Sequence, residues 1–510
     1  STSAASPADL AAAAAATFSA HAVDAAMPYL TSWRTEREAA LAALERHHPG
    51  TDPTAGLLGL ASQHADIRRR VTAEIEHPFD LARGPLFRAT ALILDASGQR
   101  HVLLLTVHHI VTDGWSMGIF WDELSALYTS QRTGHTATLA RLPIQYADFA
   151  VWQREWLQGD TLRQQVHYWT TQLANAPSAL ELPLDFPRPV LQSLRGAMET
   201  FTLSRALTQD LKTLSQRESV TLFMTLIAVF QLLLARYTGQ QDILVGTPIA
   251  GRTHDKLEGL IGLFVNTLVI RTPLQGAPTG RTLLQSIREV CLDAFANQDF
   301  PFEKLVEELH PIRDPSRHPV FQVIFHLIPP QEQGLSLPGV NVTPYPRPHT
   351  TAKFDLTCTL REHDGMLHGT LEYCTDLFET ASITRMAQHF QILLEGIVKN
   401  PDHPVFHLPL LTDTDQQRQL IEWNGTMATS SQESTIAELF EAQVAKTPEA
   451  VAVVFDDEQL VYESLNTKAN QLAHYLKKLG VGPEVRVGVC LERSVDLVIS
   501  LLGILKAGGA

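Results

Sequence analysis

The sequence has few cysteines and no close cysteine pair. Its four cysteines, Cys291, Cys358, Cys374 and Cys490, are widely spaced along 510 residues. Neither a disulfide framework nor a zinc ribbon is therefore indicated, because both need cysteines in characteristic groups. We expect a reducing, cytoplasmic location.

The sequence also has fewer basic than acidic residues and no apolar run long enough to span a membrane. Lys and Arg number 40 against 55 Asp and Glu, which gives a formal net charge of -15. No sequence-wide basic field exists to hold nucleic acid or an anionic membrane. The longest apolar runs, such as LFMTLIAVFQLLLA with Thr225 and Gln231 inside it, fall short of a membrane span. Partners of both kinds are therefore not expected.

What is present is the composition of a globular, multidomain protein. Hydrophobic residues make up 45% and charged residues 19% of the chain, as in ordinary folded domains. Strand-like and helix-like runs alternate, which favours layered α/β units. Local composition and the positions of proline and glycine divide the chain into six segments. They are an N-terminal segment (1–75), an α/β zone (76–180), a proline-rich crossover (181–197), a second α/β zone (198–411), a polar linker (412–434) and a segment in which an α/β pattern begins again (435–510).

The segment HHIVTDGWS, residues 108–116, combines residue types that can carry chemistry. Successive side chains of a strand point to opposite faces, so His108 and His109 cannot both enter one pocket if the strand runs to Ile110. Asp113 could then turn back to the base of that pocket. Gly114 would permit close backbone approach or an unusual dihedral angle, and the following Trp115 is a large anchor.

Three interpretations of this segment compete. A metal site on His109 and Asp113 is disfavoured, because adjacent histidines diverge and no HExxH motif is present. Both histidines could instead be satisfied residues at a strand end. In the third interpretation, one neutral imidazole, with an ordinary pKa of about 6.5, takes or orients a proton of an incoming amine or hydroxyl in acyl transfer.

HHIVTDGWS resembles the HHxxxDG signature of the condensation domains of nonribosomal peptide synthetases. Six later stretches resemble further motifs of that family in the same order, and the wording is most similar to the subtype that joins an L-configured donor to an L-configured acceptor. The stretches are YADFAVWQ (146–153), LPLDFPRP (182–189), GTPIAGR (246–252), IGLFVNTLVIR (261–271), NQDFPFEKLVEEL (297–309) and RDPSRHPVFQVIF (313–325).

The resemblance implies a two-lobed, chloramphenicol-acetyltransferase-like fold, a pseudo-dimer with a central tunnel. An upstream carrier domain would deliver a donor acyl thioester on a phosphopantetheine arm, and a downstream carrier would present an acceptor aminoacyl thioester. The amine would attack the donor carbonyl and form an amide. The domain itself would bind no cofactor or metal, and we expect a monomer.

The resemblance also assigns roles within the signature. His109 would line the tunnel, either as a general base or as a group that positions the amine. The backbone amide of Gly114 is a candidate donor to the developing oxyanion. Asp113 would pair with Arg252 and hold the loop, and His108 is assigned to packing.

Further polar residues are candidates for the tunnel lining. They are Ser116, Asn266, Ser316 and His318, the last standing where the family more often has asparagine; polar residues at strand ends also commonly satisfy backbone groups. A helical aromatic spacing over 146–156 predicts one packed face, formed by Tyr146, Phe149, Trp152 and Trp156.

The two ends of the chain differ in how well they resemble the domains of such synthetases. TIAELFEAQVAKTPEAVAVVF and LLGILKAGGA resemble the opening of an adenylation domain, whose remainder we expect as a partner in the full synthetase. No ATP-dependent activation is expected from residues 435–510 alone. Residues 1–75 lack the family's usual opening motifs, so they are a divergent start of the donor lobe, a fusion or reading-frame relic, or a linker from an upstream module.

Two other functions remain open from the sequence. A noncatalytic domain of the same fold could dock carriers or a tailoring enzyme, although such relatives tend to lose the histidine signature. Ester formation differs from amide formation only in the nucleophile, and no residue excludes it.

Overall fold

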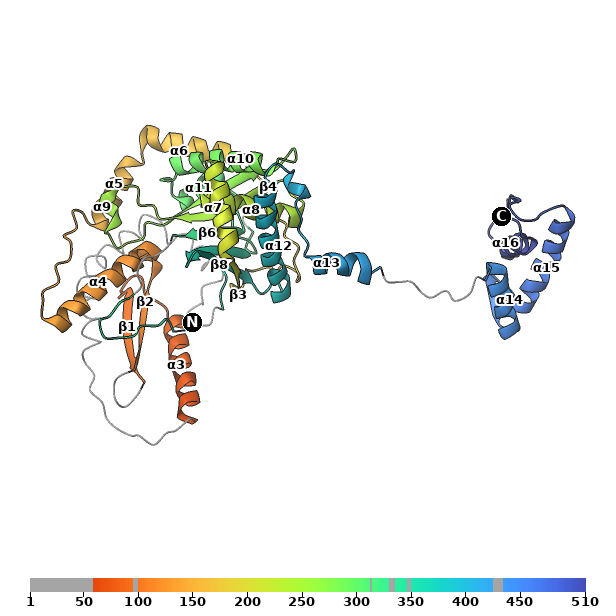
Figure 1. The fold of residues 1–510 in the computed structure, drawn as a ribbon, viewed down its shortest axis with the longest axis horizontal. Helices are drawn as coiled ribbons and strands as arrows, with labels where there is room; N and C mark the ends of the chain where they lie inside the picture. Colours follow the sequence, from red (N-terminus) through yellow and green to blue (C-terminus); the bar gives the residue numbers. More distant parts are fainter. Residues whose placement is uncertain (1–57, 95–99, 312–313, 330–334, 346–349, 425–433) are drawn as a thin grey trace, which may run out of the picture. The chain divides into compact units, whose positions relative to one another are not determined.

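A computed structural model describes residues 58–94, 100–311, 314–329, 335–345, 350–424 and 434–510. The chain divides into two compact units, Ser1–Thr412 and Asp413–Ala510. The predictions for residues 1–57 lie outside the described residues. Figure 1 shows the elements of both units in sequence colours.

The largest element of the first unit is a mixed sheet of six strands in the order β3-β8-β7-β6-β4-β5. Strand β6 pairs in parallel with both β4 and β7, and the other pairings are antiparallel. The strands are β3 (Gly196–Leu203), β4 (Asp242–Ile249), β5 (Asn266–Pro273), β6 (Val323–Ile328), β7 (Leu356–His363) and β8 (Met366–Cys374).

Four helices, which also contact one another, cover one face of this sheet (Figure 1). They are α7 (Arg205–Arg217), α8 (Leu222–Thr238), α10 (Gly280–Ala296) and α12 (Thr380–Lys399). Helix α8 is apolar on nearly all sides and buried along most of its length, as expected for a helix enclosed by protein. We call the sheet, these helices and the short elements α9 (Asp255–Glu258), α11 (Phe302–Leu309) and η2 (Val405–His407) the second lobe.

The part of the chain before the crossover is built differently. Helix α3 (Leu58–Glu76), strands β1 (Phe87–Ile93) and β2 (His101–Val107), the turn η1 (His109–Val111) and helix α4 (Gly114–Thr133) form what we call the first lobe. Strands β1 and β2 pair as an antiparallel hairpin. Helix α3 crosses the boundary predicted at residue 75 and packs Ile67 and Val71 against Val102 of β2.

Two helices connect the lobes, α5 (Tyr146–Trp156) and α6 (Gly159–Gln172). The texture of the sequence groups both with the first zone, but Trp169 of α6 is buried in the core of the second lobe. Its indole nitrogen donates a hydrogen bond to the Asn297 carbonyl oxygen, at 2.9 Å.

The predicted crossover is held along its length by the second lobe. The Leu180 amide donates to Gln322 Oε1 at 2.8 Å, and the guanidinium of Arg188 forms an ion pair with Asp355. The segment contains no helix or strand until β3 begins at Gly196. The prolines exclude a long helix or a central strand, and the contacts with the second lobe hold the segment in place instead.

The second unit begins inside the predicted linker. A short helix, α13 (Asp413–Gln417), is followed by a π-helical turn, η3 (Arg418–Glu422), so the described part of 412–434 is helical where the polar texture predicts a plain linker. Beyond it come α14 (Ile436–Lys446), β9 (Val451–Phe455), β10 (Glu458–Val461), α15 (Tyr462–Lys478) and α16 (Val495–Ala507).

Among the described helices, none is by itself long and apolar enough to cross a membrane. One bent pair, Arg205–Arg217 with Leu222–Thr238, passes that test by length and composition only.

Candidate functional site

The two adjacent histidines have different environments because the strand ends before both of them. His108 precedes the turn η1 and His109 is its first residue. Strand β2 ends at Val107, so the prediction of a strand running to Ile110 is wrong. His108 caps the turn η1, and its Nδ1 accepts a hydrogen bond from the Ile110 amide at 3.1 Å. Burial and the neighbouring His109 lower the pKa of His108. His108 is therefore a neutral imidazole with a structural hydrogen bond.

His109 has the opposite environment. It is the first residue of η1, and its side chain is exposed. Its ring receives and donates no hydrogen bond within the described part of the chain. Of the pair, only His109 offers two free ring nitrogens to an incoming molecule.

Gly114 is the first residue of helix α4. Its φ angle is not positive, so of the two expected reasons for a glycine here, close backbone approach or an unusual dihedral angle, the second does not apply. A Cβ at this position would meet nothing within 4 Å, so open space lies over the residue. As a first-turn amide it has no acceptor inside the helix, and it lies at the positive end of the helix dipole. An anion can therefore approach it.

Asp113 fixes the start of α4 and also binds the second lobe. Its Oδ1 accepts from the Ser116 amide at 2.8 Å, and its Oδ2 accepts from the Phe264 amide at 2.9 Å. Arg252 Nη2 lies 3.4 Å from Asp113 Oδ1, and both side chains are almost fully buried. We call Asp113, Ser116, Arg252 and Phe264 the clasp, because their contacts join the two lobes at the start of α4, where Gly114 lies.

Arg252 is held on all sides within the clasp. Its Nη1 donates to the carbonyl oxygens of Leu257 and Leu260, and its Nη2 donates to Ser116 Oγ at 2.8 Å. The guanidinium lies 4.0 Å from the centre of the Phe264 ring. Burial lowers the pKa of Arg252, and Asp113 opposes that effect. Removing either partner would leave an uncompensated buried charge.

Two glycines of the second lobe let the clasp close. Gly251 has a φ of 62°, and a Cβ there would lie 1.9 Å from the Phe264 carbonyl oxygen. A Cβ at Gly262 would lie 2.1 Å from the ring of Tyr146. The Tyr146 hydroxyl donates to the Leu263 carbonyl oxygen at 2.8 Å, and burial raises the pKa of Tyr146 to about 12. Gly251 lies in GTPIAGR and Gly262 lies in IGLFVNTLVIR. The motifs alone did not single out either glycine.

The aromatic face predicted for α5 is divided between interior and surface. The rings of Tyr146 and Phe149 lie 5.1 and 4.8 Å from that of Phe264. Trp152 is 47% exposed and stacks on Trp156 at 5.6 Å. At the other end of the clasp the indole of Trp115 is also exposed, and its Nε1 donates to the Glu258 carbonyl oxygen at 2.9 Å.

Two of the four candidate lining residues, the clasp residue Ser116 and Asn266, have structural hydrogen bonds. Ser116 is fully buried, and its Oγ donates to the Gly262 carbonyl oxygen at 2.9 Å. Asn266 Nδ2 donates to the carbonyl oxygens of Gln298 and Phe300 at 2.8 and 2.9 Å. These contacts match the alternative that such residues satisfy backbone groups.

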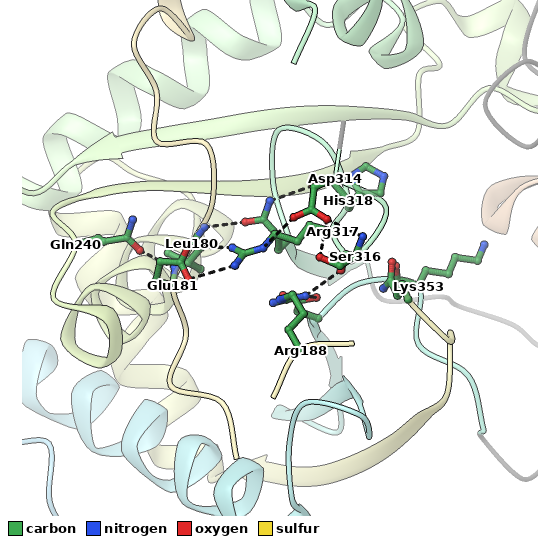
Figure 2. Close-up of polar contacts among 12 residues, drawn as sticks. Leu180, Glu181, Arg188, Gln240, Asp314, Ser316, Arg317, His318 and Lys353 are labelled. Carbon is green, nitrogen blue, oxygen red and sulfur yellow. Dashed lines mark hydrogen bonds and ion pairs between the residues drawn. The ribbon is translucent and has the colours of Figure 1, made fainter. Parts of the chain in front are cut away.

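Ser316 and His318 lie elsewhere in the second lobe, beside the crossover (Figure 2). Ser316 Oγ donates to Asp314 Oδ1 at 2.7 Å. The His318 ring packs among aromatic rings, and burial lowers its pKa. His318 lines a pocket of about 400 Å³, together with Glu181 and Arg317, which form an ion pair. No residue of 108–116 lines that pocket, so this hollow and the signature are separate features.

No cluster of three or more His, Cys, Asp or Glu side chains that could hold a metal ion occurs among the described residues.

Two family models match the chain. The first, "Condensation domain", covers residues 57–420, and the second, "AMP-binding enzyme", covers residues 440–510. The first match begins inside the range 1–75 that lacks the expected opening motifs, and close to the start of α3 at Leu58.

Curated relatives are large synthetases. One of the linear gramicidin synthase proteins of Brevibacillus parabrevis is 46% identical over 91% of this chain, and malpinin synthetase of Mortierella alpina is 43% identical over 89%. The chain spans only 6% of the length of each.

Solved structures agree on the fold. A four-domain nonribosomal peptide synthetase bound to AMP and glycine is 26% identical, with a TM-score of 0.73 over 88% of this chain and 35% of that one. The X-domain of teicoplanin biosynthesis, in complex with OxyB, is 28% identical, with a TM-score of 0.63 over 68% of this chain and 78% of that one. The chain therefore belongs to the condensation-domain family of nonribosomal peptide synthetases, and its last residues are the start of an AMP-binding domain.

Proposed function

We propose that this chain forms an amide bond between two carrier-bound substrates. The acceptor amine attacks the carbonyl carbon of the donor thioester, and the new C–N bond forms. The tetrahedral species then breaks its C–S bond, and the thiolate of the donor arm leaves with the proton that the amine gives up.

The observation that carries this proposal is that His109 is exposed and has no partner among the described residues, while the buried clasp begins four residues later at Asp113. The Ile110 amide already occupies Nδ1 of His108, whereas the described residues leave both ring nitrogens of His109 to an incoming substrate. The clasp holds Asp113, and the Trp115 indole donates to the Glu258 carbonyl oxygen, so both neighbours of Gly114 are attached to the second lobe. A catalytic group needs such a fixed position to act on a bound substrate.

Two groups supply the chemistry in this proposal. His109 accepts a hydrogen bond from the acceptor amine, as a general base or as a positioning group. The Gly114 amide donates to the oxyanion, where the helix N-terminus adds a favourable field. The space above Gly114 leaves room for the tetrahedral carbon.

The expected partners follow from the same proposal. We infer an upstream donor carrier, a downstream acceptor carrier, phosphopantetheine arms as the substrate tethers, and the remainder of the AMP-binding domain. An L-donor, L-acceptor preference, a monomeric state and a cytoplasmic location are also proposals. The four free cysteines, three of them buried, suit a reducing compartment.

The experiment is intact-protein mass spectrometry of two carrier domains loaded with different L-aminoacyl groups. We expect the acceptor carrier to gain the mass of the donor acyl group with the native chain. His109→Ala should slow this transfer by about a hundredfold or more, as for loss of a positioned acid or base. His101→Ala is the matched control, because His101 is an exposed histidine of the same β2 segment.

The alternatives correspond to other outcomes of this assay. Carrier binding without any transfer would support the noncatalytic docking function. Transfer to an acceptor carrier that bears a hydroxyacyl group, at a rate equal to that with the amine, would support ester formation. Equal rates for His109→Ala and the native chain would refute the role of His109.

A further inference from the structure

Strand β6, in the middle of the second-lobe sheet, has two different faces. The ring of Phe325 lies 5.4 Å from that of Phe230 on α8, so Phe325 faces the helices. Because side chains alternate along a strand, the next residue, His326, faces the opposite side of the sheet. The burial pattern agrees, since Phe325 is fully buried and His326 is only partly buried.

The face opposite the helices carries a polar row at the level of His326. The strand register places His326 beside Thr359 of β7, Thr359 beside Thr370 of β8, and Thr370 beside Thr200 of β3. None of these four side chains is fully buried. We call His326, Thr359, Thr370 and Thr200 the polar row; it offers uncharged hydrogen-bonding groups across four neighbouring strands.

The carboxyl ends of the parallel strands β4 and β6 lie where the chain passes to the first lobe. Three residues after β4 ends, Arg252 contacts Asp113 of the first lobe. After β6 ends, the Ser336 amide donates to Ser125 Oγ of α4 at 3.1 Å. Ligands of open α/β sheets bind outside the carboxyl ends of parallel strands, and His326 is two residues from the carboxyl end of β6.

The ring of His326 makes no hydrogen bond or ion pair with any residue that the structure describes. Burial and the nearby charge of Arg361 lower its pKa, so the imidazole is neutral and has one donor and one acceptor. Partly buried polar groups usually have a partner, which suggests that a bound molecule supplies it.

We propose that His326, on the sheet face opposite the helices of the second lobe, hydrogen-bonds the amide groups of a carrier's phosphopantetheine arm. This inference rests on the proposed function. The arm is an uncharged chain of amides along most of its length, so it matches the uncharged donors and acceptors of the polar row. His326 would then be a residue of the second lobe that positions the arm, whereas His109 belongs to the first lobe.

A labelling experiment tests this contact without relying on acyl transfer. His326→Cys and His363→Cys are made in a Cys490→Ser background, because Cys490 is the exposed native thiol and the other three are buried. His363 is the comparison because it is an exposed residue at the end of β7. Each variant is treated with chloroacetyl-pantetheine and, separately, with chloroacetamide; in both reactions the thiolate displaces chloride and forms a C–S bond.

The measured quantity is the ratio of the two labelling rates, which corrects for the intrinsic reactivity of each thiol. We expect this ratio to be at least about tenfold higher at position 326 than at position 363, because the arm binds before it reacts. Equal ratios at the two positions would overturn the inference.

A second pair of variants uses the transfer assay. His326→Leu removes the hydrogen-bonding groups and should lower transfer about threefold to tenfold, as for one neutral hydrogen bond. His326→Gln keeps a donor and an acceptor and should retain most of the native rate. Native rates for both variants would refute the role of His326 while leaving the proposed function intact, whereas absence of transfer by the native chain would refute the function and leave the labelling result to decide on His326.

Discussion

The two lobes differ in how their cores are completed. In the second lobe one continuous core extends from the sheet through α7, α8, α10 and α12. The described first lobe has only small clusters, around Phe120 and around Val71. Those clusters are completed by second-lobe side chains, namely Ile261 and Leu335 in one and Tyr345 in the other.

This difference shows why the signature segment depends on the second lobe. His109 and Gly114 lie on the lobe with the smaller cores, and the clasp attaches their loop to the lobe with the large one. The exact placement of the site is therefore a property of the contact between lobes. Substitutions on either side of that contact should separate the contribution of each lobe.

The largest effect is expected from breaking the clasp. Asp113→Ala leaves Arg252 as an uncompensated buried charge, and it also removes the cap of α4. We expect a loss of about 3–5 kcal/mol in the free energy of unfolding, measured by urea denaturation. Asp113→Asn keeps the shape and part of the hydrogen bonding, so it should cost less; equal stability of Asp113→Ala and the native chain would show that the clasp does not hold the lobes.

A smaller effect is expected from two matched glycine substitutions. Gly262→Ala brings a Cβ against Tyr146 and should cost about 1–3 kcal/mol of stability, as overpacking does. Gly114→Ala meets no atom and should leave the thermal midpoint unchanged. It should nevertheless slow acyl transfer if a tetrahedral carbon occupies that space. A native transfer rate in Gly114→Ala would argue against the proposed oxyanion position.

The smallest effect is a difference in acid sensitivity. Burial lowers the pKa of His318 in the second lobe, so the unfolded chain binds a proton more readily than the folded one. The free energy of unfolding is therefore undiminished by this histidine above about pH 6.5. As the pH falls below that value, protonation favours the unfolded chain and the free energy of unfolding drops by up to about 1.4 kcal/mol per pH unit. His318→Asn should therefore lose less stability than the native chain between pH 7.5 and 5.5, as followed by urea denaturation; identical losses would contradict the assignment.

Much of the fold could be predicted from the sequence. The alternation of strand and helix runs favours an α/β structure, and the motif resemblance implies the condensation fold, which the comparisons confirm. The crossover is predictable because proline and glycine exclude regular structure. The domain boundaries remain predictions; helix α3 extends across the one at residue 75, and α6, which the sequence groups with the first zone, packs into the second lobe.

The local geometry of the site was less predictable. Strand β2 stops at Val107 because the His108 ring accepts the Ile110 amide, a contact that a two-residue periodicity does not reveal. The need for glycine at 262 comes from Tyr146, which is more than a hundred residues away in the chain. Such requirements arise only when distant segments meet, so a single sequence gives residue types and not their contacts.

The second lobe positions the signature of the first through the clasp, and the placement of His109 depends on that contact. The most direct test is the initial rate of acyl transfer between two loaded carriers by Asp113→Asn, at a temperature where its circular dichroism equals that of the native chain. We predict a rate at least about tenfold below native, because a misplaced catalytic group loses its advantage even in a folded protein. An undiminished rate in a folded Asp113→Asn variant would contradict this role of the clasp.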